Sequence, residues 1–426
     1  MLSKNNNQFS TLSTGNRPSF MAYFVYLIVV LFLVYEMALQ VSPSIITHQL
    51  MRDIHIEASL LGIISGVYFY SYMFMQIPSG LLFDRLKTRW LIAIAILICV
   101  LGTVFFASSQ TVWEAALGRF LMGIGSAGAF ISVLVVSSRW FPISYFALLV
   151  GIAQLLAAAG ALGGEAPLAI FTTALGWRAA LYWLSLIGVF LALAVWLVLK
   201  NEPTPITHSS HTQLRISQSL KIVLSSSQTW WIALYAFCGW GPVATFASLW
   251  GVPYLMSLYH ISNTMAAVAC SMIWIGLMIG SPFFGWFSSY LGQRRIFLRV
   301  CSLLGLTVSL IILYVPGVPF GLMLILLLGF GIATSGHILT FAFAKEIHSP
   351  QVTATVIGFN NMAVVAGGAI FQPLVGVVLR FCWQGEMLNS VPLYTVSNYQ
   401  TALFIVPLCY LVGWVVSQFL IRETHF

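Results

Sequence analysis

Twelve long apolar segments constrain this sequence of 426 residues more than any other feature. A transmembrane helix needs about 20 mostly apolar residues. Segments that meet this requirement lie at approximately residues 20–42, 58–82, 90–109, 113–137, 143–171, 178–199, 229–257, 264–289, 296–315, 320–343, 351–379 and 400–421. Membrane β-strands are about 10 residues long and alternate polar and apolar residues, unlike these segments. The sequence therefore predicts an all-α membrane protein with twelve transmembrane helices.

The composition excludes several classes of protein. Apolar residues make up 60% of the chain and charged residues only 7%, whereas soluble domains carry roughly a quarter charged residues. The net charge of +8 comes from 18 basic residues that form no patch, so we expect a lipid bilayer and no nucleic acid as partner. The six cysteines lack C-x-x-C spacing, so we expect no metal and no cofactor.

The distribution of Lys and Arg predicts the orientation. Cytoplasmic loops of membrane proteins are enriched in these residues. With the N-terminus in the cytoplasm, 14 of the 18 basic residues lie in cytoplasmic segments and three, Arg52, Arg178 and Arg380, lie on the other side. Arg119 falls inside the fourth span. We therefore expect a multi-pass protein of the inner (plasma) membrane with both termini in the cytoplasm.

A polar stretch in the middle of the chain divides the spans into two groups of six. The expected organisation is a cytoplasmic tail (1–19), an N-terminal six-helix bundle (20–199), a cytoplasmic linker (200–228), a C-terminal six-helix bundle (229–422) and a short cytoplasmic tail (423–426).

The loops after the second and eighth spans have related sequences. The first contains Gly80-x-x-x-Asp84-Arg85-x-x-x-Arg89, and the second begins at Gly285, 205 residues later. Internal similarity at half the chain length is typical of transporters built from repeated bundles. The first loop resembles the most specific signature of the major facilitator superfamily, which implies two pseudo-symmetric six-helix bundles that work by alternating access.

The resemblance also implies a conformational latch at this loop. In the family, the acidic residue pairs with basic groups and with the N-terminus of a helix in the other half, as the helix dipole favours. The latch would comprise Gly80, Asp84, Arg85, Arg89 and Arg139. In the second copy, Ser289 replaces the acidic residue, so the mirrored latch lacks its charge. Alternatively, the basic residues of the loop only determine topology.

Two further segments bear on coupling. Arg119-x-x-x-Gly123-x-Gly125 resembles the family motif in the fourth helix, whose arginine is tied to proton coupling in several members. The fifth span partly resembles the antiporter motif, but Ala161 follows Gly160 where the motif has proline. Antiport is therefore not supported.

Three charged residues lie inside the first six spans, where charge is costly and indicates function. Glu36, Arg119 and Glu165 each lie about six residues, or roughly 9 Å, from the non-cytoplasmic surface. We expect one polar cluster in which Arg119 pairs with one glutamate and the other carries a proton, because a buried carboxyl without a partner favours its protonated form. The alternative is a static ion-pair triad that holds three helices together.

Uncharged polar residues supply candidates for solute binding. Gln40 lies one helical turn after Glu36 on the same face. In the second half, His337 is a candidate for proton coupling, although a histidine that only bonds to a neighbouring group is an equal alternative. Among the amides, we favour Asn360 over Asn361 for solute binding, together with Gln372.

The seventh span contains Gly241-Pro242 near its middle. A proline there frees a backbone carbonyl and permits a kink, and broken helices often line binding cavities. Tyr235, Trp240 and Thr245 are therefore candidate solute contacts, although aromatic packing against neighbouring helices is the commoner role.

Together these features predict a monomeric secondary active transporter, and not an enzyme, for a small polar organic solute such as an amino acid, peptide, organic acid or siderophore-like compound. We expect proton-coupled uptake. An exporter or antiporter, and a sensor of the same fold that binds solute without moving it, are the alternatives. The sequence has no Walker-type phosphate loop for ATP-driven transport.

Overall fold

The computed structural model describes residues 18–199, 216–349, 352–388 and 391–423. These residues contain twelve helices that are long and apolar enough to cross a membrane, which confirms the predicted fold class. The first bundle comprises α1 (Phe20–Val41), α2 (Pro43–Ile54), α3 (Ala58–Arg85), α4 (Thr88–Ser108), α5 (Val112–Trp140), α6 (Ile143–Leu175) and α7 (Trp177–Val198).

The second bundle follows a short helix, α8 (Ile216–Ser225), that lies within the expected linker. Two spans of this bundle are irregular. A π-helical turn interrupts the seventh span of the chain, and a 3-10 turn interrupts the tenth. The elements are α9 (Ser227–Thr245), η1 (Phe246–Trp250), α10 (Gly251–Tyr259), α11 (Asn263–Leu291), α12 (Arg295–Tyr314), α13 (Phe320–Thr334), η2 (Ser335–Ile338), α14 (Leu339–Glu346), α15 (Thr353–Cys382), β1 (Met387–Leu388), β2 (Val391–Pro392), α16 (Val396–Ala402), α17 (Ile405–Val415) and η4 (Val416–Leu420). The two-residue strands form a small antiparallel hairpin.

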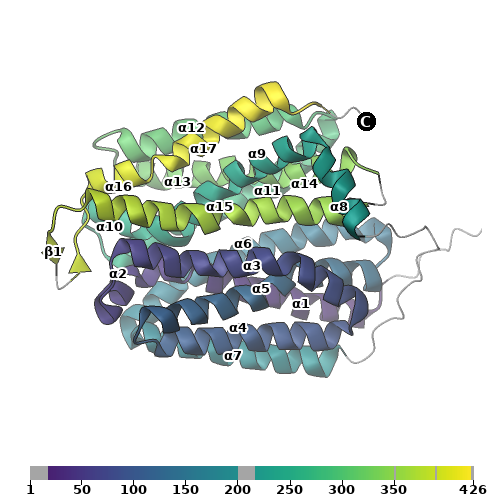
Figure 1. Cartoon of the computed structure of the whole chain (residues 1–426), viewed down its shortest axis with the longest axis horizontal. Coiled ribbons are helices and arrows are strands. Elements are labelled where there is room, and N and C mark those ends of the chain that lie inside the picture. The colour runs from purple at the N-terminus through teal and green to yellow at the C-terminus, as the bar shows by residue number, and fades with distance from the viewer. Residues whose placement is uncertain (1–17, 200–215, 350–351, 389–390, 424–426) are drawn as a thin grey trace, which may run out of the picture.

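The two bundles lie side by side with their long helices running in similar directions (Figure 1). The interface between them consists mainly of α3 against α15 and α6 against α11. We call the end that carries α2, α10, α16 and the hairpin the loop end, and the end that carries α8 and the C-terminus the linker end (Figure 1).

Glycines of α3 and α15 show that the bundles touch closely at the loop end. A Cβ atom added at Gly62 would lie 2.5 Å from the carbonyl oxygen of Gln372, and one at Gly376 would lie 2.3 Å from that of Ala58. Near the linker end, by contrast, a Cβ at Gly80 or Gly358 would meet nothing within 4 Å. The same pair of helices is therefore tightly packed at the loop end, and open space lies beside these two glycines near the linker end.

Polar contacts between the bundles also gather at the loop end. The carboxylate of Glu57 pairs with Arg380 at 2.8 Å, and the Asn263 amide donates to the carbonyl of Ile45 at 2.8 Å. In addition, the backbone N–H of Ala58 donates to the hydroxyl of Tyr394 at 3.1 Å. These contacts close the loop end in the conformation described.

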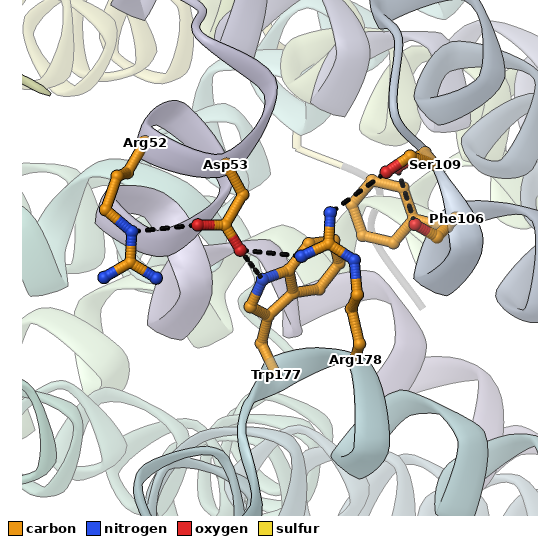
Figure 2. A network of polar contacts seen from close by, with 6 residues as sticks. All are labelled: Arg52, Asp53, Phe106, Ser109, Trp177 and Arg178. Carbon is orange, nitrogen blue, oxygen red and sulfur yellow. Dashed lines mark hydrogen bonds and ion pairs between the residues drawn. The ribbon is translucent and has the colours of Figure 1, made fainter. Parts of the chain in front are cut away.

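A second polar network ties α2 to α7 within the first bundle (Figure 2). The carboxylate of Asp53 accepts hydrogen bonds from Arg52 at 2.8 Å, Trp177 at 2.9 Å and Arg178 at 2.6 Å. Arg178 also donates to the carbonyl of Ser109, just beyond α4. Burial of Asp53 raises its pKa, but these hydrogen bonds outweigh burial and hold the pKa below its usual range.

We expect Asp53→Asn to lower the thermal stability of the purified protein by a few degrees at neutral pH. The charge-assisted hydrogen bonds that it weakens are worth about 1–3 kcal/mol. Because the folded-state pKa lies below the unfolded value of about 3.9, the carboxylate stabilises the fold above that pH, and this contribution is lost as the pH falls through the folded-state pKa. The stability difference between wild type and variant should therefore shrink toward pH 3. Glu386→Gln, at an exposed carboxylate, is the control, and an equal effect of both variants would refute the role of the network.

Candidate functional site

A cavity lies between the two bundles, with about 690 Å³ of space not filled by atoms, including its open mouth. Its lining comes from α1, α3, α5 and α6 on one side and from α9, α11, η2, α14 and α15 on the other. The polar lining residues are Glu36, Gln40, Tyr72, Gln154, His337 and Asn361, and Trp240 adds an indole ring. Apolar side chains such as Leu33, Phe69 and Phe341 form most of the remaining wall. This is the usual composition of a small-molecule site, mostly apolar with a few polar groups.

Glu36 is the acidic residue of this cavity. Its side chain is only 1% exposed, and its Oε1 accepts a hydrogen bond from the hydroxyl of Tyr68 at 2.5 Å. The ring of Tyr68 in turn lies against the guanidinium of Arg119, whose Cζ is 4.5 Å from the ring centre. Tyr68 therefore connects Glu36 to Arg119.

Arg119 bonds to the backbone where the first span ends. Its Nη1 donates to the carbonyl of Leu39 at 2.9 Å, and its Nη2 to that of Gln40 at 3.5 Å. Pro43 explains the first bond, because proline has no N–H to offer the carbonyl four residues earlier. Among the described residues, no ion pair within 4.0 Å joins Arg119 to Glu36 or Glu165, which differs from the pairing that we expected.

Glu165 lies apart from this pair, at the interface between the bundles. Its Oε2 accepts a hydrogen bond from Ser271 of α11 at 3.4 Å. Trp274, also on α11, lies beside the carboxyl, but the indole Nε1 and Oε1 of Glu165 both lack a hydrogen-bond partner. The expected single cluster of three charges is therefore divided into two sites.

The packing of α6 explains the position of Glu165. Gly160 and Gly164 pack tightly on α1, where a Cβ at Gly164 would lie 2.7 Å from the Cα of Ala38. Successive residues of a helix are about 100° apart, so Glu165 points away from the glycine face and toward α11.

His337 and Trp240 form the opposite wall. Their rings are 4.9 Å apart between centres, and Nδ1 of His337 lies 2.8 Å from the carbonyl of Thr334. A carbonyl only accepts, so Nδ1 carries the proton. In the neutral ring, Nε2 is then a hydrogen-bond acceptor.

The amides of α15 differ from the sequence-based expectation. Asn361, not Asn360, lines the cavity, and its Nδ2 donates to Oε1 of Gln76 in the other bundle at 3.0 Å. Asn360 instead donates to Thr340 at 2.9 Å within the second bundle. Gln372 lies nearer the loop end and donates to the carbonyl of Ala244 at 2.6 Å.

Two other candidates are not among the residues that line the cavity. The hydroxyl of Tyr235 donates to the carbonyl of Leu298 at 2.8 Å, and the hydroxyl of Thr245 donates to that of Gly241 within its own helix at 2.7 Å. Of the aromatic and hydroxyl residues predicted in the broken span, Trp240 alone is among the lining residues.

The residues of the expected latch lie at the linker end. The side chains of Asp84 and Arg85 fall outside the described part of the structure. The guanidinium of Arg89 lies over the ring of Trp196 at 3.8 Å, and Arg139 donates to the hydroxyl of Thr88 at 2.8 Å and the carbonyl of Phe83 at 2.9 Å. The latch stays a prediction.

Comparison with known proteins agrees with the architecture. A family model described as Major Facilitator Superfamily matches residues 20–372. The chain belongs to this superfamily. It is a multi-pass membrane transporter of the superfamily type, a class of proteins that is generally non-enzymatic.

Individual relatives are distant. The chain is 25% identical to "Uncharacterized transporter YybO" of Bacillus subtilis over 267 residues, which cover 59% of this chain and 61% of that protein. It is 22% identical to "Ascorbate transporter, chloroplastic" of Arabidopsis thaliana, over 86% of this chain and 71% of the relative. A crystal structure of a bacterial homologue of the lysosomal transporter Spinster, in an inward-facing and occupied conformation, superposes with a TM-score of 0.77 at 15% identity, covering 96% and 98% of the two chains. This last similarity shows the fold alone.

Sequence reasoning missed Tyr68, Ser271 and Trp274, which bond to or lie beside the two buried glutamates. Tyr68 and Tyr72 stand four residues apart in an apolar helix, and that spacing was the available signal. Ser271 and Trp274 gave no such signal in the sequence, because small and aromatic residues are common throughout these spans.

Proposed function

We propose that the protein is a secondary active transporter that couples the uptake of a small polar organic solute to protons by alternating access. The observation that carries the proposal is the pair of fully buried glutamates. One faces the cavity, and the other lies at the contact between the two halves, where no ion pair to it is found among the described residues. Buried carboxyls of this kind mark proton pathways in membrane proteins.

The two glutamates have different roles in this proposal. Glu36 contacts the solute, and Glu165 carries the coupling proton. When the loop end is open, water reaches Glu165 and the carboxyl takes up a proton. The neutral acid can then be buried against Ser271 and Trp274, so that the loop end closes around bound solute. Release of the proton on the other side resets the cycle.

The contacts at the loop end support a closed state on that side of the membrane. If both termini lie in the cytoplasm of a cell whose inner membrane holds the protein, the closed side is the non-cytoplasmic one. Several relatives bear the names of transporters for small organic compounds, such as sulfoacetate and ascorbate. We propose that a single chain performs the cycle.

We expect the protein in lipid vesicles to accumulate solute when the interior is made alkaline. With one proton per solute, a gradient of one pH unit supports an accumulation of about tenfold. A protonophore should abolish it. The solute for this assay is the compound that most raises the thermal stability of the purified protein.

Three results would contradict the proposal. Accumulation that is unchanged by the protonophore would exclude proton coupling. Binding without any movement of solute would indicate a sensor, and accumulation only with an acidic interior would indicate an exporter or antiporter.

A further inference from the structure

The charges that face the cavity are unbalanced. Glu36 is a lining residue, and no Lys or Arg is among the described residues that line this space. Arg119 is 0% exposed and is not among the lining residues. It lies behind the ring of Tyr68 and uses its guanidinium for backbone carbonyls. A bound solute therefore meets a carboxyl and no cation.

The groups around Glu36 also suit a positive charge. The indole ring of Trp240 lines the facing wall, and aromatic faces attract cations within about 6 Å. Nε2 of the neutral His337 ring accepts hydrogen bonds. A solute carboxylate would instead lie near Glu36 in a water-poor space with no Lys or Arg among the described lining residues, which is unfavourable.

One donor of a lining residue lacks a partner. Nε2 of Gln40 is buried without a hydrogen bond, and the residue is 5% exposed although it lines the cavity. Leaving such a group unpaired is costly. Gln40 lies one turn from Glu36 on α1, about 6 Å along the helix. A solute that satisfies both residues needs a positive donor and an oxygen acceptor at about that separation.

We propose that the solute is a small organic amine whose ammonium group binds Glu36 and whose hydroxyl or carbonyl oxygen binds Gln40. The inference rests on the proposed function and names its substrate class. It departs from the organic anions in the names of several relatives, such as ascorbate and sulfoacetate.

The test uses three sets of compounds that differ mainly in charge. They are glucosamine, glucose and glucuronate; 2-amino-1,3-propanediol, glycerol and glycerate; and 4-amino-1-butanol, 1,4-butanediol and 4-hydroxybutanoate. The full chain is purified in detergent at neutral pH, and its melting temperature is measured with each compound at about 10 mM. We expect stabilisation by at least one ammonium compound and by none of the carboxylates. Stabilisation by a carboxylate, or by no ammonium compound, would overturn the proposal.

Variants then locate the bound amine. We expect Glu36→Gln to weaken binding of the stabilising amine at least tenfold, and Gln40→Leu to weaken it about tenfold. Glu386→Gln makes the same chemical change on an exposed residue and should leave binding unchanged. The unliganded melting temperature of each variant shows whether it is folded. Unchanged affinity in folded Glu36→Gln protein would overturn the proposal.

Binding in detergent needs no proton gradient, so the two proposals can fail separately. Amine binding without pH-driven transport would refute the coupling and keep the substrate class. Carboxylate binding with pH-driven transport would refute the substrate class and keep the coupling.

Discussion

Replacing Glu165 by glutamine is expected to abolish accumulation of solute against its gradient while solute exchange across the membrane continues. Glutamine has nearly the same shape and can still bond to Ser271 of α11, so the bundles can still close at the loop end. It cannot bind and release a proton in the working pH range, so the pH gradient no longer drives the cycle. We expect accumulation to fall from about tenfold to equilibrium under a gradient of one pH unit.

The measurement compares two assays on the same vesicles. One follows uptake driven by an alkaline interior, and the other follows exchange of labelled for unlabelled solute at equal pH. Glu386→Gln should behave as wild type in both. Accumulation by Glu165→Gln at the wild-type level would show that the coupling proton is carried elsewhere, and loss of exchange in a folded variant would assign Glu165 a structural role.

Replacing Gly62 by leucine is expected to prevent closure of the loop end and to reduce transport at least tenfold. A Cβ atom at this position would lie 2.5 Å from the carbonyl oxygen of Gln372 and 3.0 Å from the Cα of Pro373. Backbone atoms cannot turn aside as a flexible side chain can, so α3 and α15 must separate. The variant should therefore favour the conformation that is open at the loop end.

This shift can be measured by labelling a cysteine at the closed interface. Ser59 is 5% exposed, and its Cα lies 3.2 Å from where a Cβ at Gly376 would be. In a Cys382→Ser background, we expect Ser59→Cys to react several-fold faster with a membrane-impermeant maleimide when Gly62→Leu is present. Gly321→Leu is the matched control, because a Cβ there meets nothing within 4 Å. Normal transport by Gly62→Leu would argue against closure through this contact.

The architecture was predictable because the bilayer imposes a length on each helix. Twelve apolar segments of sufficient length gave the spans, and the family motif at Gly80 to Arg89 gave the two-bundle arrangement. The kink expected at Gly241-Pro242 is not where the helix becomes irregular, because α9 continues through Pro242 to Thr245 and the π-helical turn follows at Phe246–Trp250.

The cavity was predictable only in part. Glu36, Gln40, Trp240 and His337 line it, whereas other candidates point elsewhere. In a helix that is apolar on every side, periodicity does not indicate the inward face. Asn360 and Asn361 are neighbours about 100° apart, and only their contacts show which one faces the other bundle.

The position of Arg119 depended on an interaction that side-chain patterns do not reveal. Its partners are backbone carbonyls at the end of α1, one of which lacks its usual backbone N–H donor because of Pro43. An arginine that satisfies carbonyls need not pair with a glutamate. Glu165 instead contacts α11, and the sequence gave no reason to expect a partner there.

Proton movement caused by solute tests the central claim most directly. Vesicles that contain the protein and a trapped pH-sensitive dye would be mixed with the stabilising solute at equal pH on both sides and with the membrane potential clamped. We expect inflow of solute to acidify the interior in wild type and to cause no pH change in Glu165→Gln. Solute entry into wild-type vesicles at constant internal pH would contradict the account.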